Sequence, residues 1–138
     1  MIILDTNVLS ELMTPNPNNS VMSWFAVQSE QALFTTSITQ AEMCLGVAIL
    51  PAGQRQSSLL VAIEEVFNQD FAGRILAFDS SVVRAYVQIV THRKQIGRPI
   101  SQFDAQIAAI AKAYDAILAT RNIKDFENCG IELVNPWL

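Results

Sequence analysis

Ile2-Ile3-Leu4-Asp5-Thr6-Asn7 opens the chain with a pattern that indicates its fold class. Three consecutive apolar residues, two of them β-branched, are typical of a strand that is buried on both faces, as in a parallel sheet. This strand ends at Asp5, which is therefore expected at the carboxyl edge of the sheet, where open α/β proteins bind their ligands. Because an ionised side chain is costly to bury without a compensating charge, we also expect a cation near Asp5.

Apolar strands and amphipathic helices alternate along the rest of the chain. Strands are predicted at residues 2–4, 33–38, 74–78, 116–120 and 131–134, and helices at 8–13, 20–28, 39–50, 54–68, 82–97 and 101–114. Ser20, Thr39 and Ser101 are the expected N-caps of three of these helices. The alternation predicts an α/β protein with a mostly parallel five-stranded sheet and helices on both faces. At this length we expect a single domain, residues 1–138.

The composition is apolar, with 51% hydrophobic and 16% charged residues. It excludes a disordered chain and indicates a large core together with an apolar oligomer interface. No apolar run approaches the roughly 18 residues of a membrane span and no basic signal region begins the chain, so we expect a cytoplasmic protein. The net charge of −4 counts against nucleic-acid binding, unless several acids surround a divalent cation that inverts the local charge.

Cysteine and histidine usage excludes several kinds of site. Cys44 and Cys129 have no metal-binding spacing and are expected to be packed thiols without a disulfide. His92 is the only histidine and is expected to be solvated at a helix end, whereas a metal-free ribonuclease normally needs two acid–base groups. The absence of G-x-S-x-G, Walker and G-x-G-x-x-G patterns counts against serine hydrolases and P-loop enzymes.

Four acidic residues fall at strand ends or in the first turn of a helix: Asp5, Glu42, Asp79 and Asp104. Two of them have an alternative structural explanation, because Thr39-x-x-Glu42 is a capping-box pattern and Ser101-x-x-Asp104 resembles one. Asp104, however, lies at the border of a buried helical stripe, and a residue that only caps a helix need not point in that direction. That stripe is expected to bury Phe103, Ile107, Ile110, Ala111 and Tyr114.

Convergence of Asp5, Glu42 and Asp104 would make a metal site. Two carboxylates about 5 Å apart repel by about 3 kcal/mol at an effective dielectric constant near 20, so a cation between them is expected. Oxygen ligands without His or Cys suit Mg²⁺ or Mn²⁺. The chemistry typical of such a site is phosphodiester hydrolysis, in which the ion activates a water molecule and stabilises the leaving oxygen.

Basic residues lie near this predicted site in two groups. Arg93, Lys94 and Arg98 precede the helix that carries Asp104, and Arg121 and Lys124 flank the end of the fourth strand. Each of them can equally be ordinary surface charge. As a set, they are predicted to contact phosphates and to guide a nucleic-acid strand to the metal.

Short motifs distributed over nearly the whole chain form a recognisable set. They are Ile3-Leu4-Asp5-Thr6-Asn7, Thr39-x-x-Glu42-x-x-x-Gly46, Phe71-Ala72-Gly73-Arg74-Ile75-Leu76 with Phe78-Asp79, Asp104-x-x-Ile107-Ala108, Ala119-Thr120-Arg121-Asn122 and Asn135-Pro136-Trp137. In this order they resemble the PIN-domain family, in particular VapC-type toxins of toxin–antitoxin systems and, among these, the FitB subgroup. The resemblance implies a three-layer α/β/α sandwich with strand order 3-2-1-4-5, in which Asp79 is a helix cap on an outer strand.

The resemblance also implies a function. Asp5, Glu42 and Asp104 correspond to the acidic ligands of a Mg²⁺- or Mn²⁺-dependent endoribonuclease toxin, which hydrolyses RNA with a metal-activated water and leaves 3′-hydroxyl and 5′-phosphate ends. Asn122 stands where many members have a fourth acid, and it is expected to position a water or a weakly bound second ion. Thr6, Thr120 and Asp125 are expected to support the site. A homodimer and a cognate VapB- or FitA-like antitoxin, whose tail occupies the acidic groove, are implied as well.

Two alternative functions stay open at this point. The missing acid at Asn122 is the one sequence feature that suggests a catalytically weak PIN scaffold acting through its partner. A receiver-like signalling domain also gathers acids at the ends of parallel strands and binds Mg²⁺. It needs a Lys at the end of the last strand, however, where this chain has Asn135-Pro136.

Overall fold

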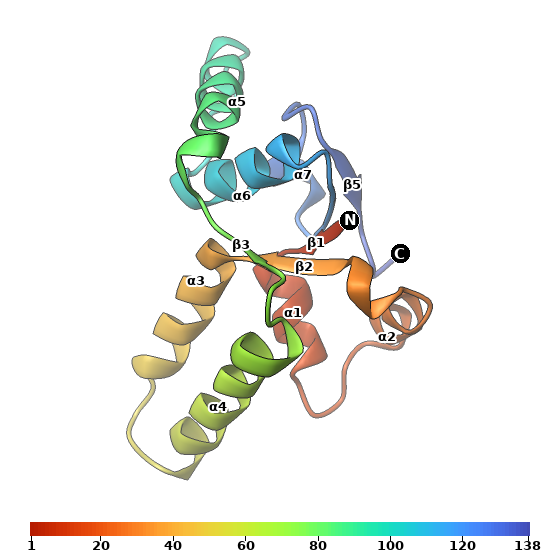
Figure 1. Cartoon of the computed structure of the whole chain (residues 1–138), viewed down its shortest axis with the longest axis vertical. Helices are drawn as coiled ribbons and strands as arrows, with labels where there is room; N and C mark the ends of the chain where they lie inside the picture. Colours follow the sequence, from red (N-terminus) through yellow and green to blue (C-terminus); the bar gives the residue numbers. More distant parts are fainter.

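Five short strands form one parallel sheet in the computed structural model, which describes residues 1–138 (Figure 1). They are β1 Ile2–Leu4, β2 Leu33–Thr36, β3 Ile75–Leu76, β4 Ile117–Ala119 and β5 Glu132–Val134. Their order is β3-β2-β1-β4-β5, and every neighbouring pair is parallel. This order confirms the one implied by the family resemblance. It contradicts the receiver-like alternative, whose doubly wound sheet has the order 2-1-3-4-5.

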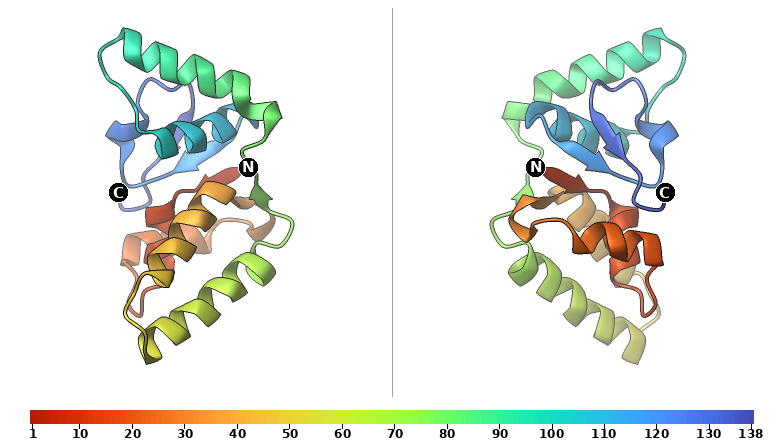
Figure 2. Two further views of the ribbon diagram at one scale, coloured as in Figure 1. Left: turned by 90° about the vertical axis from the view of Figure 1, so that its left-hand side faces the viewer. Right: turned by 90° about the vertical axis from the view of Figure 1, so that its right-hand side faces the viewer.

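Helices cover both faces of the sheet. They are α1 Thr6–Leu12, α2 Asn19–Ala26, α3 Ser37–Ala48, α4 Gln54–Glu65, α5 Val83–Gln95, α6 Gln102–Ala113 and α7 Ile123–Phe126. Figure 2 shows α5, α6 and α7 on one side of the sheet and α1 to α4 on the other. A π turn at Val66–Asp70 and 3₁₀ turns at Glu30–Ala32 and Ser80–Val82 complete the regular structure. The predicted α/β/α sandwich is confirmed.

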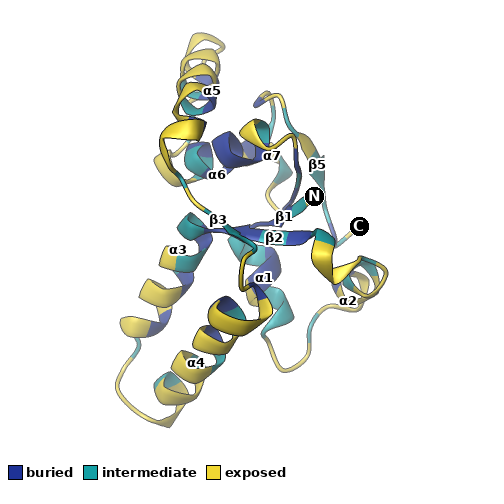
Figure 3. Cartoon of the chain, in the orientation of Figure 1, coloured by how far each residue is buried: buried dark blue, intermediate teal, exposed yellow.

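β1 lies at the centre of the sheet and contributes to two apolar cores. Figure 3 shows that the central strands are largely buried. Ile3 is fully buried in a core that includes Ile107 of α6. Leu4 is fully buried in a second core, which includes Val8 of α1. Successive strand side chains point to opposite faces, and each such side chain contributes about 1.5–3 kcal/mol when buried. Two helical layers therefore hold the strand that ends at Asp5.

Three helices, α1, α2 and α3, begin one or two residues earlier than predicted. The side-chain oxygen of Asn18, and not Ser20, caps α2 by accepting the N–H of Ser20 at 2.9 Å. Thr36 caps α3 by accepting the N–H of Thr39 at 3.1 Å, so Thr39 lies inside the helix and is fully buried. Because Thr36 also pairs with Leu76 of β3, β2 ends there and the helix starts at once. Ser101 caps α6 as predicted, accepting the N–H of Asp104 at 3.3 Å.

Three side chains that were expected to be buried, those of Phe103, Tyr114 and Cys44, are exposed. Phe103 is 55% exposed and Tyr114 is 42% exposed, because the buried stripe of α6 covers only its middle, from Ala105 to Ala111. Cys44 is exposed on α3, whereas Cys129 is buried as predicted, and both thiols are free.

Asp79 caps the turn Ser80–Val82, which confirms its implied role. None of the helices combines the length and apolar character needed to span a bilayer.

Candidate active site

β1 and β4 are neighbouring parallel strands at the centre of the sheet, so their carboxyl ends lie side by side at one sheet edge. The backbone N–H of Asp5 donates to the carbonyl of Ala119 at 2.9 Å, which places Asp5 next to Thr120. The chain leaves β1 into α1 on one face and leaves β4 towards α7 on the other face (Figure 2). A crevice at such a divergence is the usual ligand site of an open α/β sheet.

Asp5 is 5% exposed and held by three donors. Its Oδ1 accepts the N–H of Thr6 at 2.8 Å, and its Oδ2 accepts the Thr120 hydroxyl at 2.7 Å and the Asn7 amide at 3.4 Å. Burial nevertheless raises the pKa of Asp5 from 3.8 to about 6, against the lowering effect of the bonds from Thr120 and Thr6. The charges of Asp104 and Glu42 raise it further. The fold therefore orients this carboxylate and disfavours its charge.

Glu42 lies in the second turn of α3, on the same side as Asp5. The Thr6 hydroxyl donates to Glu42 Oε1 at 3.1 Å and lies 3.1 Å from the hydroxyl oxygen of Thr39. Because Thr36 is the helix cap, Glu42 does not belong to a capping box, and that structural explanation is wrong. Burial raises the pKa of Glu42, and the charge of Asp104 raises it further.

Asp104 lies in the first turn of α6 and is half-buried at the border of the buried stripe, as predicted. Burial raises its pKa, a hydrogen bond with Ser101 lowers it, Asp125 raises it and Arg93 lowers it. Asp104 therefore has both a capping partner and electrostatic contact with the other acids. The three predicted acids come from the end of β1, from α3 and from α6. The charge of Asp104 raises the pKa of both Asp5 and Glu42, and the charge of Glu42 raises that of Asp5.

The remaining predicted site residues surround these acids. Thr120 is fully buried, and its hydroxyl oxygen accepts the N–H of Asn122 at 3.1 Å. Asn122 directly precedes α7, but its side chain makes no capping hydrogen bond to that helix. Asp125 lies in α7 and acts on Asp104 through its charge.

Asn7 is a site residue to which sequence reasoning gave no role. Its amide nitrogen lies 3.4 Å from both Asp5 Oδ2 and the Thr120 hydroxyl oxygen, and its side-chain oxygen accepts the N–H of Arg121 at 3.2 Å. It therefore ties the end of β1 to the end of β4. The only sequence signal was its position two residues after Asp5 in the opening motif.

The donor set suits a hard divalent cation. No three carboxylate, imidazole or thiol side chains lie close enough together to hold an ion as they stand. Asp5 is nevertheless a buried carboxylate outside both ion pairs of the chain, which are Arg74–Glu30 and Arg98–Glu127. The nearby donors are all oxygens, which Mg²⁺ and Mn²⁺ prefer. On the chemistry of its donors and the burial of Asp5, the site fits such an ion.

The predicted RNA-contacting cations do not behave as one set. Arg93 is 4% exposed, and its guanidinium donates to the carbonyls of Arg98, Asp125 and Glu127 at 2.6, 2.9 and 3.0 Å. The prediction that Arg93 contacts RNA is therefore wrong, because its donors are used inside the protein. Arg98 pairs with Glu127 at 3.1 Å. Lys94, Arg121 and Lys124 are exposed.

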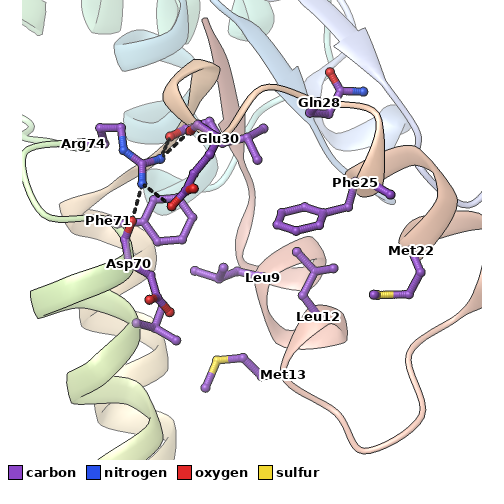
Figure 4. A pocket seen from close by; sticks show the side chains of 13 residues that line it. Leu9, Leu12, Met13, Met22, Phe25, Gln28, Glu30, Asp70, Phe71 and Arg74 are labelled. Carbon is purple, nitrogen blue, oxygen red and sulfur yellow. Dashed lines mark hydrogen bonds and ion pairs between the residues drawn. The ribbon is translucent and has the colours of Figure 1, made fainter.

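Two hollows lie among the helices α1 to α4. One of about 630 Å³ runs between α1, α3 and α4, and Thr6 and Glu42 at its end connect it to the acids. Another of about 460 Å³ is lined by apolar residues such as Leu12, Met22 and Phe25, with Arg74 hydrogen-bonded at its rim (Figure 4). The second hollow contains none of the predicted site residues. Of these two, the first shares Thr6 and Glu42 with the candidate active site.

The chain is similar to known proteins over its whole length. The PIN domain matches residues 2–130. VapC ribonuclease Y4jK from Sinorhizobium fredii is 38% identical over 137 residues, which cover 99% of this chain and 98% of that protein. Toxin FitB from Neisseria gonorrhoeae is 39% identical over 137 residues, which cover 99% of both chains. The structure of FitAB bound to an IR36 DNA fragment superimposes with a TM-score of 0.94 at 40% identity, covering 100% of this chain and 96% of that one.

Proposed function

The chain belongs to the PIN-domain family, and from this premise we propose that it is a divalent-metal-dependent endoribonuclease, the toxin of a type II toxin–antitoxin pair. Full-length similarity to proteins named VapC ribonuclease and Toxin FitB supports this function. The observation that carries it is the setting of Asp5, a buried carboxylate at the switch point of the sheet whose pKa is raised by the charges of two further acids.

Asp5, Glu42 and Asp104 would hold Mg²⁺ or Mn²⁺. When bound, such an ion lowers the pKa of a water molecule and stabilises negative charge on a phosphodiester. Thr120 and Thr6 orient the carboxylates of Asp5 and Glu42 by donating hydrogen bonds to them. The amide of Asn122 would hydrogen-bond a water at the position of the missing fourth acid. It adds no negative charge, so a second ion would bind weakly.

Cleavage of RNA by the purified chain tests this proposal. We expect cutting with Mg²⁺ or Mn²⁺, none with EDTA, and a loss of at least about 100-fold in Asp5→Asn, the scale of removing one essential catalytic interaction. The products should carry 3′-hydroxyl and 5′-phosphate ends. Lys112→Ala at the far end of α6 serves as the control and should cut normally. Cutting that resists EDTA, or cyclic phosphate products, would exclude the mechanism.

The proposal includes two protein partners. One is a cognate VapB- or FitA-like antitoxin, supported by similarity to the chain in FitAB and to that in VapBC2 from Rickettsia felis, which is 26% identical with a TM-score of 0.78. The other is a second copy of this chain: we propose that the single domain, residues 1–138, forms a homodimer. Co-purification with the product of an adjacent short reading frame would identify the antitoxin.

A catalytically weak scaffold is the second candidate function. Asn122 in place of an acid favours it, as does the spacing of the acids, no three of which are close enough to hold an ion as they stand. Titration of Mn²⁺ into antitoxin-free protein distinguishes the two functions. Cleavage that rises and saturates with Mn²⁺ supports the nuclease, whereas no cleavage at any concentration supports the scaffold.

A further inference from the structure

Arg121 and Trp137 form a cation–π pair beside the candidate active site. The central guanidinium carbon of Arg121 lies 5.1 Å from the centre of the Trp137 ring. Arg121 directly follows Thr120, whose hydroxyl donates to Asp5. The backbone N–H of Arg121 donates to Asn7, which also hydrogen-bonds Asp5. The main chain of Arg121 is therefore fixed by the same network that orients the buried carboxylate.

The last turn of the chain holds Trp137 in place. The N–H of Trp137 donates to the side-chain oxygen of Asn135 at 3.0 Å, and the N–H of Leu138 donates to the Asn135 carbonyl at 3.2 Å. The ring is partly buried and packs against the core that contains Leu4 and Ala119. It therefore offers a fixed aromatic face, and a guanidinium stacked on it loses less freedom on binding than a free side chain does.

Arg121 combines exposure with a fixed position, unlike the other basic residues of this region. Arg93 uses its donors inside the protein, and Arg98 is paired with Glu127. Arg121 takes part in neither of the two ion pairs of the chain. A guanidinium that lies over an aromatic ring still has N–H groups that can donate to phosphate oxygens.

We propose that Arg121, positioned by Trp137, binds a backbone phosphate of the RNA close to the phosphate that is cleaved. The pair then sets the affinity for RNA and leaves the chemical step unchanged. A chain of net charge −4 with acids at its site needs such a contact, because phosphates are drawn to Lys and Arg. A phosphate contact also carries no base preference. This inference rests on the proposed ribonuclease function.

Binding of a labelled short single-stranded RNA to the Asp5→Asn protein, followed by fluorescence anisotropy over a range of salt concentrations, tests the contact. Arg121→Ala should weaken binding about tenfold, the effect of losing one charge-assisted hydrogen bond. It should also lower the slope of log K against log salt by about 0.7, the value for one phosphate of a single strand. Lys112→Ala removes the same charge from the far end of α6 and should leave the slope unchanged.

Substitutions of Trp137 separate positioning from folding. Trp137→Leu should weaken binding about threefold, the scale of one exposed cation–π contact, with an unchanged salt slope because Arg121 keeps its charge. Trp137→Phe retains an aromatic face and should restore most of the affinity. In the Arg121→Ala background Trp137→Leu should have no further effect, because Trp137 acts only through Arg121.

Steady-state cleavage completes the test in the chain with Asp5 intact. Arg121→Ala should raise KM and change kcat by less than about twofold. Unchanged RNA affinity and salt slope in Arg121→Ala would overturn the proposal, and so would a Trp137→Leu effect that persists in that background. A wild-type chain that binds RNA through Arg121 without cutting it would instead count against the nuclease function, since the anisotropy measurement needs no catalysis.

Discussion

The carboxyl group of Asp5 is held where its own charge is disfavoured. Burial raises its pKa from 3.8 to about 6, although Thr120 and Thr6 donate hydrogen bonds to it. A rise of this size corresponds to about 3 kcal/mol. Without a cation nearby, ionised Asp5 therefore destabilises the fold. A residue that lowers stability and is nevertheless firmly oriented is typical of a functional site.

The pH dependence of stability should report this directly. Because the pKa of Asp5 is raised in the folded state, the folded protein binds the proton more tightly than the unfolded chain does. The resulting stabilisation is present below about pH 4 and is lost as the pH rises through about 6. Relative to Asp5→Asn, metal-free wild-type protein should lose about 3 kcal/mol of unfolding free energy over this range. Urea denaturation in EDTA measures the difference, and a difference that does not vary with pH would contradict the assignment.

Local sequence patterns selected the candidate acids of the site but not every residue that holds them. Asp5 follows an apolar run, and Asp104 borders a helical stripe, so local patterns were sufficient to select both. The role of Asn7 could not be predicted in this way. Its amide meets Thr120, 113 residues further along the chain, and only the pairing of β1 with β4 brings the two together.

The start of α3 determines the environment of Glu42. Thr36, Ser37 and Thr39 are all suitable caps by residue type, and the sequence pattern favoured Thr39. Pairing of Thr36 with Leu76 ends β2 at Thr36 and makes that residue the cap. Glu42 consequently moves from the first to the second turn, where the Thr6 hydroxyl can reach it. Strand pairing therefore overrides a local capping signal.

Arg93 connects α5 to the two segments that lead to the site. Its guanidinium donates to Arg98 before α6 and to Asp125 and Glu127 around α7. A polar run, Thr91-His92-Arg93-Lys94, gave no indication that one of its members is buried. Side-chain burial in such a run depends on which helix face meets the neighbouring loops, and this is a tertiary property.

Arg93→Met should lower the unfolding free energy by about 2–4 kcal/mol, because buried carbonyls lose their donors. Lys94→Met removes the same charge from the same helix at an exposed position and should change it by less than about 0.5 kcal/mol. Urea denaturation of both variants at neutral pH gives the comparison. Equal, small effects would show that Arg93 is an ordinary surface cation.

The strand order β3-β2-β1-β4-β5 brings distant parts of the chain to one sheet edge. Alternating strands and helices predicted a parallel sheet with two covered faces, but periodicity alone does not give the order of strands. The order came from the family resemblance, because each motif constrains only its own segment. The two cores on opposite faces of β1 then follow from the order and from the alternation of strand side chains.

Exposed apolar side chains gather where α3 and α6 approach each other. Leu45 is 62% exposed, Ile49 is 73% exposed, and both line a hollow of about 310 Å³ together with Phe103 and Glu42. Leu45 and Ile49 are one turn apart, so they share one side of α3. Grouped exposed apolar residues are typical of an interface. This face is where we place the contact of the proposed homodimer, which would set two acidic sites near each other.

Leu45→Glu and Phe103→Glu should each convert the dimer into a monomer. In a two-fold symmetric interface every substitution occurs twice, so each variant buries two charges in apolar contact without partners. Val61→Glu on α4 alters a residue that is 66% exposed and lies outside this hollow, so it should leave the mass of the particle unchanged. Size-exclusion chromatography with light scattering gives the mass, and circular dichroism verifies folding. A dimer that survives each of these substitutions would place the interface elsewhere, because an apolar interface does not tolerate two unpaired carboxylates at its centre.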